Sequence, residues 1–515
     1  MKPIPYLKQE GKQTTLMVDN APFLILGGEL HNSSGSDLNY MEEHVWPGLR
    51  KLGGNCYLTP VYWECMEPER GKYDFTLVDG VIAQARREGV RLVLLWFGLW
   101  KNGGSSYTPA WVKTNSDYFY MCGMDGRMVE SVSPFCEDAV KADQEAFSRL
   151  MEHLRDTDEE RTVIMVQVEN ETGIWGHPRD YCKAADRLFY QEIPGEMAEL
   201  YGTCGTWEEA FGLNACDYFM AWGLSRAVGR IAEAGKKIYG LPLFMNCVAI
   251  GLPLRAGQVP GGGPLPRVHK IWRRFAPAID LYGPDLYSPF YKEACDDFAA
   301  ANALIIPETA QDKDTASKAL YTVAAYHTVC FSPFGIDGMM MPISENDLLA
   351  QTNSDLGGSP AGAGERLAKA YRILHVLWEE IREAQKNGRI YAFLQQNEPR
   401  AEFLLKDYVI DVSFGDGGIS GHLGQPGHRK EGAPIGGGFI IRKEEDRFLV
   451  CGISCNVQVK PRYAGREHVF ILDKRELLCT TNGLVLGRIL NGDERNYMAI
   501  GEEPSIQEIA FYHRF

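Results

Sequence analysis

The sequence of 515 residues contains no hydrophobic run that approaches the roughly 20 residues needed for a membrane-spanning helix. Its first ten residues, MKPIPYLKQE, lack the apolar core of a secretion signal. We therefore expect a bacterial cytoplasmic protein with no membrane partner. The thirteen cysteines include no Cys-x-x-Cys pair, which argues against a structural zinc site. Reduced, buried thiols are the expectation for such a protein.

Positive charge is also scarce. The 53 Lys and Arg residues face 68 Asp and Glu residues, which gives a net charge of −15. This balance argues against nucleic acid as a partner. The segment Gly27-Gly28-Glu29-Leu30-His31 does not fit the glycine-rich phosphate turn that follows the first strand of a doubly wound dinucleotide-binding sheet. We expect no metal and no organic cofactor, and a homo-oligomer is compatible with the sequence.

Apolar segments alternate with amphipathic helical patterns from about residue 20 to about residue 345. The eight segments that read as strands are residues 23–30, 55–62, 91–97, 163–168, 237–245, 279–286, 303–307 and 330–337. Helical patterns between them include residues 78–88, 137–154, 215–234 and 316–328. Eight apolar strands that alternate with helices predict an α/β fold, a (β/α)₈ TIM barrel.

The texture of the sequence changes after residue 386. Residues 363–386 form one more helical pattern, and short alternating segments with Asn-Gly turns follow it. We therefore predict two domains, a barrel with an N-terminal extension and a trailing helix at residues 1–385 and a smaller antiparallel, sandwich-like β domain at residues 386–515. A glycine-rich stretch at residues 415–438 is predicted to be a loop, either a spacer or a segment near an active-site mouth.

Two glutamates follow buried strands at positions where a barrel holds its reacting groups. Glu171 comes after the apolar run at 163–166, and Glu308 comes after the run at 303–306. These are the fourth and seventh predicted strands, which lie on opposite sides of a barrel mouth. Facing carboxyl groups about 5 Å apart would suit retaining glycoside hydrolysis, in which one is protonated and the other attacks the sugar.

Several motifs resemble glycoside hydrolase family 35, the β-galactosidases, within clan A. The string Gln-Val-Glu-Asn-Glu-Thr-Gly at 167–173 is similar to the QIENEYG signature of that family. Residues 55–75 resemble N-x-x-x-T-Y-V-x-W-N-x-H-E-P…G-x-Y-D-F, and His31 resembles the His of its first strand. The resemblance covers roughly residues 20–345. It implies a barrel in which Glu171 is the acid/base and Glu308 the nucleophile.

The sequence departs from the family pattern at several positions. Pro60 replaces the second-strand Tyr, Thr172 replaces the Tyr of the signature, and Leu99 stands where a Glu precedes the third-strand Trp. The C-terminal β domains of the family are reduced to one. We therefore read the chain as an outlying branch whose sugar specificity is open.

Further residues at predicted strand ends are candidates for binding substrate. Asn170 would bind the sugar 2-hydroxyl, and the resemblance to clan A implies that Tyr287 donates to the nucleophile. Glu169 points away from Asn170 in a strand and is interpreted as a structural ion-pair partner. The remaining candidates, each with core packing or surface exposure as the alternative, are Trp63, Glu29, His31, Trp100, Lys101, Asn102 and Asp337.

The sequence as a whole predicts a retaining exo-β-glycosidase of β-galactosidase type that acts on a small carbohydrate or glycoconjugate. Alternatives are a β-glycosidase for a fucoside, arabinopyranoside, glucoside or plant glycoconjugate, and a sugar-binding barrel without activity. A barrel lyase or aldolase would need a buried lysine or a metal cluster at the strand ends, and Lys101 is the only lysine that we identify as a candidate.

Overall fold

The computed structural model describes residues 2–11, 13–249, 255–340, 361–414, 432–462, 468–480, 483–495 and 498–514. Most of the predicted glycine-rich loop, residues 415–431, lies outside this range. Two compact units are present, one formed by Met1–Pro47 and Asn55–Thr309 and the other by Gly48–Gly54 and Ala310–Phe515. The predicted domain boundary at residues 385 and 386 stays a prediction. Within the described residues, no helix has both the length and the apolar character to cross a membrane.

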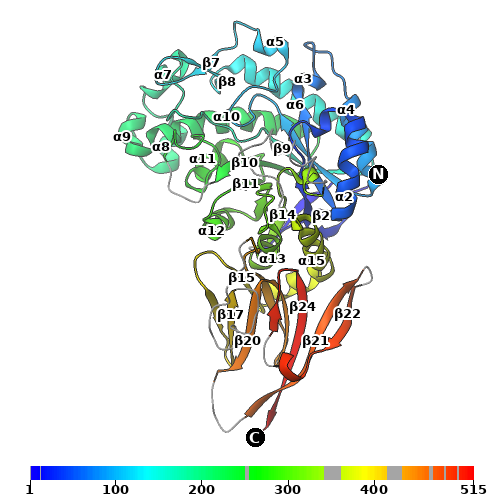
Figure 1. The fold of residues 1–515 in the computed structure, drawn as a ribbon. Coiled ribbons are helices and arrows are strands. Elements are labelled where there is room, and N and C mark those ends of the chain that lie inside the picture. The colour runs from blue at the N-terminus through cyan, green and yellow to red at the C-terminus, as the bar shows by residue number, and fades with distance from the viewer. Residues whose placement is uncertain are drawn as a thin grey trace. The chain divides into compact units, whose positions relative to one another are not determined.

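The largest sheet of the protein is a parallel β-barrel, as predicted (Figure 1). Its sheet has the strand order β12-β14-β4-β5-β6-β9-β10-β11-β13. Strands β12 and β13 are two parts of one strand that is interrupted at Pro307, because proline lacks the N–H that a ladder needs. Eight strands therefore make the barrel. Their bounds are β4 Ile25–Glu29, β5 Cys56–Tyr62, β6 Arg91–Phe97, β9 Val163–Val168, β10 Leu243–Ala249, β11 Leu281–Leu286, β12 Leu304–Ile306, β13 Glu308–Thr309 and β14 Thr328–Phe331.

The strands are buried along almost their whole length because helices cover the outside of the sheet. The helix α6 shows why the sequence folds this way, since acidic Glu137 and Asp138 occupy its first turn and its apolar side chains lie on one face. The longer helices are α4 Thr76–Glu88, α6 Glu137–Thr157, α10 Ala215–Ile238, α12 Tyr291–Ala301, α13 Thr315–Ala325 and α15 Ala363–Lys386. Shorter helices are α1 Leu38–Tyr40, α2 Trp46–Leu52, α3 Trp63–Met66, α5 Ala110–Lys113, α7 Lys183–Phe189, α8 Gly195–Tyr201, α9 Trp207–Phe211 and α11 His269–Phe275.

Two predicted strands differ from the observed strands by more than two residues. The strand predicted at 237–245 begins only at Leu243, because the amphipathic helix α10 continues to Ile238 with Lys236 and Lys237 in its last turn. The strand predicted at 330–337 ends at Phe331. Gly335 then takes a left-handed conformation with φ of 68°, and a short 3₁₀ helix follows at Ile336–Gly338.

Antiparallel strands form the remaining sheets. An N-terminal sheet contains β1 Tyr6–Glu10, β2 Gln13–Val18 and β3 Ala21–Phe23, and a hairpin after the third barrel strand contains β7 Tyr120–Cys122 and β8 Met128–Val132. The second unit contains β15 Ile390–Leu394, β16 Arg400–Leu404, β17 Tyr408–Phe414, β18 Gly437–Glu444, β19 Arg447–Ile453, β20 Cys455–Pro461, β21 His468–Thr480, β22 Gly483–Ile489, β23 Met498–Ile500 and β24 Ser505–Arg514.

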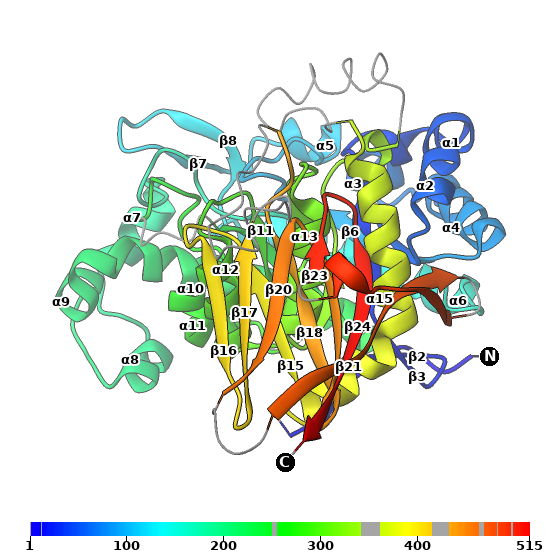
Figure 2. The same ribbon diagram turned by 60° about the horizontal axis from the view of Figure 1, so that its bottom comes forward.

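The β-rich part of the second unit is built from two sheets, of order β15-β18-β19-β24-β21-β22 and β16-β17-β20-β23 (Figure 2). One apolar core joins them, because Ile440, Phe448 and Ile509 of the larger sheet pack with Ile410 and Val457 of the smaller one. This is the packing of a β-sandwich. The antiparallel β domain that the sequence predicts is therefore present.

Candidate active site

Glu171 and Glu308 lie at the same end of the barrel, as the strand count predicts. Glu171 is the third residue after β9, the fourth barrel strand, and Glu308 is the first residue of β13, in the seventh. Both side chains are buried. One carboxyl oxygen of each lies within 4.8 Å of the other and of an oxygen of Asp285. The fold thus brings together two glutamates that are 137 positions apart in the sequence.

The backbone around Glu171 is unusual. Glu169 and Glu171 both take left-handed conformations, with φ of 62° and 44°, and Asn170 stands between them. Such values are uncommon for residues other than glycine and have an energetic cost. The backbone N–H of Glu171 donates to Asn246 Oδ1 at 3.0 Å, and that of Asn170 donates to the carbonyl oxygen of Trp100 at 3.1 Å. These contacts hold the strained turn in place.

Three donors converge on the carboxylate of Glu308. The hydroxyl of Tyr287 donates to Oε2 at 2.8 Å, and the side-chain amides of Asn170 and Asn246 approach Oε1 at 3.4 and 3.5 Å. Hydrogen bonds of this kind favour the ionised form of a carboxyl group. The ring of Tyr287 is 37% exposed, but its hydroxyl points inward. Burial and the charge of Glu308 raise the pKa of this hydroxyl well above its ordinary value, so it stays a donor.

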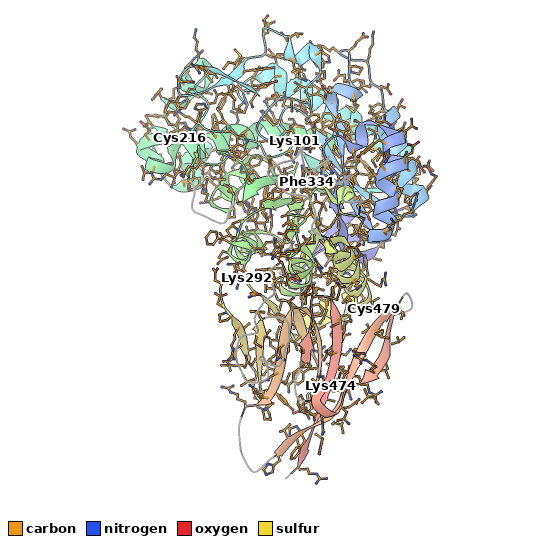
Figure 3. All side chains as sticks on the ribbon, viewed as in Figure 1. Lys101, Cys216, Lys292, Phe334, Lys474 and Cys479 are labelled. Carbon is orange, nitrogen blue, oxygen red and sulfur yellow. The ribbon has the colours of Figure 1, made fainter. Side chains whose placement is uncertain are left out.

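Lys101 supplies positive charge to this acidic site. Its ammonium group is buried in the barrel unit, donates to Asn170 Oδ1 at 2.9 Å and lies 4.9 Å from the centre of the Phe97 ring (Figure 3). Burial alone would lower its pKa. The surrounding carboxyl groups, with Glu308 and Glu29 as the strongest, outweigh burial and raise the pKa, so Lys101 is charged.

The other carboxyl groups of the cluster all have raised pKa values. Burial, reinforced by the charge of Glu308, raises the pKa of Glu171 to about 7, although Lys101 and Asp285 act in the opposite direction. Burial and the neighbouring charges of Glu308 and Glu171 raise the pKa of Asp285 well above its usual value. Burial and the charge of Glu308 likewise raise the pKa of Glu29 well above its usual value. The site therefore offers one carboxyl that exchanges its proton near neutral pH beside another that is held by three donors.

The same carboxyl groups are the residues that could hold a metal. Glu171, Asp285 and Glu308 present oxygen ligands of the kind that hard cations such as Mg²⁺ or Ca²⁺ prefer. The charged Lys101, however, interacts with all three and would repel a cation placed among them. The arrangement suits proton transfer and nucleophilic attack better than metal binding.

Glu169 binds the backbone that follows the third barrel strand, next to Lys101 of the site. Its carboxyl group accepts the backbone N–H of Trp100 at 2.7 Å and that of Leu99 at 3.3 Å. Asp143 of α6 accepts the same Leu99 N–H at 2.8 Å and the indole N–H of Trp96 at 2.8 Å. Burial and the adjacent Asp143 raise the pKa of Glu169 well above its ordinary value. Glu169 was predicted to be an ion-pair partner, whereas in the structure it hydrogen-bonds to the two backbone N–H groups and to the side chain of Asp143.

The remaining candidates are placed in different surroundings. Trp63 is buried against Trp96 and Trp111 and donates its indole N–H to Glu67 at 2.8 Å. Trp100 is buried and donates to the carbonyl oxygen of Val132 at 2.9 Å. The rings of both tryptophans therefore belong to the core.

Asn102 is exposed in a turn with φ of 51°. His31 is buried two residues after β4, and Asp337 is buried in the 3₁₀ helix Ile336–Gly338 of the second unit. A part in binding substrate stays a prediction for each of these three residues.

Two residues of the cluster were not found from the sequence. Asp285 lies on β11 two positions before Tyr287, and alternation along a strand could have placed both on the same face. Asn246 was missed because the fifth strand was predicted to end at residue 245, four positions before its end at Ala249. The signal for Asp285 was therefore present, and the signal for Asn246 depended on the strand boundary.

Comparison with known proteins gives two family matches. Residues 15–217 match the model of glycosyl hydrolases family 35, and residues 367–500 match a domain of unknown function, DUF5597. A β-galactosidase of Xanthomonas manihotis is 28% identical over 203 residues, which are 38% of this chain and 31% of that protein. The chain thus spans about a third of the length of this curated relative.

Solved structures with similar folds include two β-galactosidases and a glycoceramidase. The enzyme of Marinomonas ef1 is 12% identical, with a TM-score of 0.45 and coverage of 69% of this chain and 60% of its own. The enzyme of Halorubrum lacusprofundi is 13% identical, with a TM-score of 0.46 and coverage of 69% and 58%. Endo-glycoceramidase II of a Rhodococcus species is 13% identical, with a TM-score of 0.43 and coverage of 96% and 98%. Over residues 15–217, which include Glu29, Lys101 and Glu171, the sequence of this chain resembles glycosyl hydrolases family 35.

Proposed function

We propose that this protein is a retaining exo-β-glycosidase that removes a terminal β-galactosyl group. Glu308 attacks the anomeric carbon while Glu171 gives its proton to the leaving-group oxygen. Water then attacks the glycosyl-enzyme ester, Glu171 takes a proton from that water, and the bond to Glu308 breaks. Each step conserves protons and electrons within the two carboxyl groups, the sugar and water.

The observation that carries this proposal is the separation of the two carboxyl groups. An oxygen of Glu171 and an oxygen of Glu308 lie within 4.8 Å of each other. Carboxyl groups of retaining glycosidases are about 5–5.5 Å apart, whereas inverting enzymes need about 6.5–9.5 Å to admit a water molecule. The short separation supports direct attack by a carboxylate.

The surroundings of each carboxyl group support its role. Glu171, with a pKa of about 7, can hold a proton near neutral pH and also accept one. Glu308 accepts from the hydroxyl of Tyr287 at 2.8 Å, which favours the ionised nucleophile. Asn170, 3.4 Å from Glu308, can reach a sugar hydroxyl beside the nucleophile. Glu29 and Lys101 would complete a polar pocket for the remaining sugar hydroxyls.

The assignment can be tested with aryl glycosides. Wild-type protein should hydrolyse 4-nitrophenyl β-galactoside faster than the β-fucoside, β-glucoside and α-arabinopyranoside, and proton NMR should show the β-anomer of the sugar as first product. A 2-deoxy-2-fluoro-β-galactoside with a dinitrophenolate leaving group should attach covalently to Glu308, detected by peptide mass spectrometry. Glu196→Ala, at an exposed glutamate in the first turn of α8, is the matched control.

Two variants separate the roles. Glu308→Gly should abolish turnover, and azide should restore it with a product of inverted configuration. Glu171→Ala should keep substantial activity on dinitrophenyl substrates, which need no acid, and lose it on phenyl substrates. The proposal fails if Glu171→Ala reduces both equally, or if the first product is the α-anomer. A faster reaction on another sugar would keep the mechanism and change the specificity.

A further inference from the structure

One tryptophan beside the proposed active site keeps much of its ring in solvent. Trp175 is 45% exposed and lies in the loop after β9, four positions after Glu171. The proposed mechanism gives it no role. The tryptophans considered above, Trp63, Trp96 and Trp100, are buried. An exposed indole at this position therefore calls for an explanation.

The exposed ring is held in one orientation. Its indole N–H donates to the carbonyl oxygen of Asn102 at 2.9 Å. A β-carbon at Gly103 would lie 2.8 Å from Trp175 Cδ1, so the absence of a side chain lets the ring lie directly on this turn. Lys101, which directly precedes Asn102 in the sequence, donates to Asn170 in the site. Trp175 is thus tied to the turn that carries a charged residue of the site.

The loop that carries Trp175 is also anchored on its other side. A β-carbon at Gly173 would lie 2.6 Å from Pro260 Cβ and 3.0 Å from the carbonyl oxygen of Gly261. Gly173 therefore packs closely on the segment that follows β10. An ordered loop that holds a tryptophan outward differs from a mobile loop whose tryptophan is exposed by chance.

The chemistry of the ring defines what it can bind. Because the only donor of the indole is already used by Asn102, the exposed part is an apolar π-surface. Such a surface stacks on flat, carbon-rich groups, either another aromatic ring or the C–H face of a pyranose. Its N–H donor is no longer free to hydrogen-bond a polar ligand.

We propose that Trp175 is a binding platform for the leaving group, one with a flat carbon-rich ring, such as a phenol or a second sugar. This inference rests on the proposed function, because the acid Glu171 must face the leaving-group oxygen. The chain that continues from Glu171 then runs along the leaving-group side of the site and presents Trp175 there. The platform selects what is cleaved off, whereas the carboxyl cluster holds the sugar that is transferred.

Binding of two non-hydrolysable probes tests the platform without catalysis. Methyl 1-thio-β-galactoside and phenyl 1-thio-β-galactoside share the sugar and differ in the group that would lie on Trp175. We expect wild-type protein to bind the phenyl probe about fivefold more tightly, which is within the range of one aromatic contact. Trp175→Ala should remove this difference and leave the affinity for the methyl probe unchanged, whereas Trp175→Phe should keep part of it. Leu213→Ala, at a residue that is 81% exposed, is the control.

A second measurement protects the test against a variant that folds poorly. In wild-type protein labelled with ¹⁵N in its indoles, the Trp175 signal should move on addition of the phenyl probe and stay in place with the methyl probe. Equal affinity of wild-type protein for both probes, or an equal loss for both in Trp175→Ala, would overturn the inference.

Kinetics separate this inference from the proposed function. β-Galactosyl fluoride has no ring in its leaving group, so Trp175→Ala should cleave it at the wild-type rate and should lose about fivefold in kcat/KM on lactose and on 4-nitrophenyl β-galactoside. A loss on only one of these two substrates identifies whether the platform takes a sugar or an aromatic ring. If wild-type protein does not cleave the fluoride, the proposed function fails, and the binding of the two probes still decides the role of Trp175.

Discussion

The raised pKa of Glu171 leads to a prediction about the pH dependence of the reaction. If Glu171 is the acid, kcat/KM for phenyl galactosides should fall above pH 7, because the residue has a pKa of about 7 and must be protonated to act. The fall should be about tenfold per pH unit. Dinitrophenyl galactosides need no acid, so their kcat/KM should not follow this limb.

Burial and the charge of Glu308 together set the size of the shift in the Glu171 pKa. A rise of the Glu171 pKa from 4.5 to about 7 corresponds to about 3 kcal/mol that disfavours its charged form. Burial is the largest cause and the charge of Glu308 is the second. Two charges 4.8 Å apart, the largest separation of these oxygens, interact by about 3 kcal/mol at an effective dielectric constant of about 20, so the charge of Glu308 is large enough to supply a substantial part of the rise. Removal of this charge should therefore lower the Glu171 pKa by on the order of one unit.

Glu308→Gln provides the direct measurement. Glutamate labelled with ¹³C in its carboxyl group allows the titration of Glu171 to be followed by NMR in this inactive variant, and Glu171→Gln identifies its signal. The Glu171 pKa should be near 6 in Glu308→Gln, which is on the order of one unit below its wild-type value. An unchanged Glu171 pKa in Glu308→Gln, or an alkaline limb of equal strength for phenyl and dinitrophenyl substrates, would contradict the role of Glu171 as the acid beside a charged Glu308.

The barrel could be predicted from the sequence because its strands are buried on both faces. Such strands are nearly continuous apolar runs, and the runs at 91–97 and 163–168 coincide with β6 and β9. Boundaries failed where a helix ended in a mixed segment, as between α10 and β10. The end of that strand was predicted four residues too early, and Asn246, the first residue beyond the predicted end, was therefore not recognised as a member of the site.

The support around Glu169 could not be predicted for a different reason. Asp143 reaches the same backbone N–H as Glu169 only because α6 packs behind β6 and β9, and local sequence patterns do not specify which helix residue faces a strand end. Trp175 presented a similar problem. Its exposure and its contact with Asn102 depend on two loops that meet only in the folded barrel.

The remaining predictions concern the residues that hold the carboxyl groups. Tyr287→Phe removes the 2.8 Å hydrogen bond to Glu308. It should lower kcat on dinitrophenyl galactosides by about 10- to 100-fold, which is the range for a hydrogen bond to a charged group, and should leave Tm unchanged. An unchanged kcat would contradict this role of Tyr287. Glu169→Gln should fold and flatten the dependence of stability on pH, as measured by urea unfolding between pH 5 and pH 8. A carboxyl group whose pKa is higher in the folded protein than its unfolded value near 4.5 holds its proton after the unfolded chain has released it. Its contribution to stability is therefore largest at low pH and decreases as the pH rises above 4.5, by up to about 1.4 kcal/mol per unit, until the folded carboxyl itself ionises. Glutamine cannot ionise, its one carbonyl oxygen can still accept the N–H of Trp100, and Asp143 still accepts that of Leu99. Wild-type protein should therefore lose more stability than Glu169→Gln over this interval, and parallel losses in the two proteins would show that Glu169 is already ionised when folded.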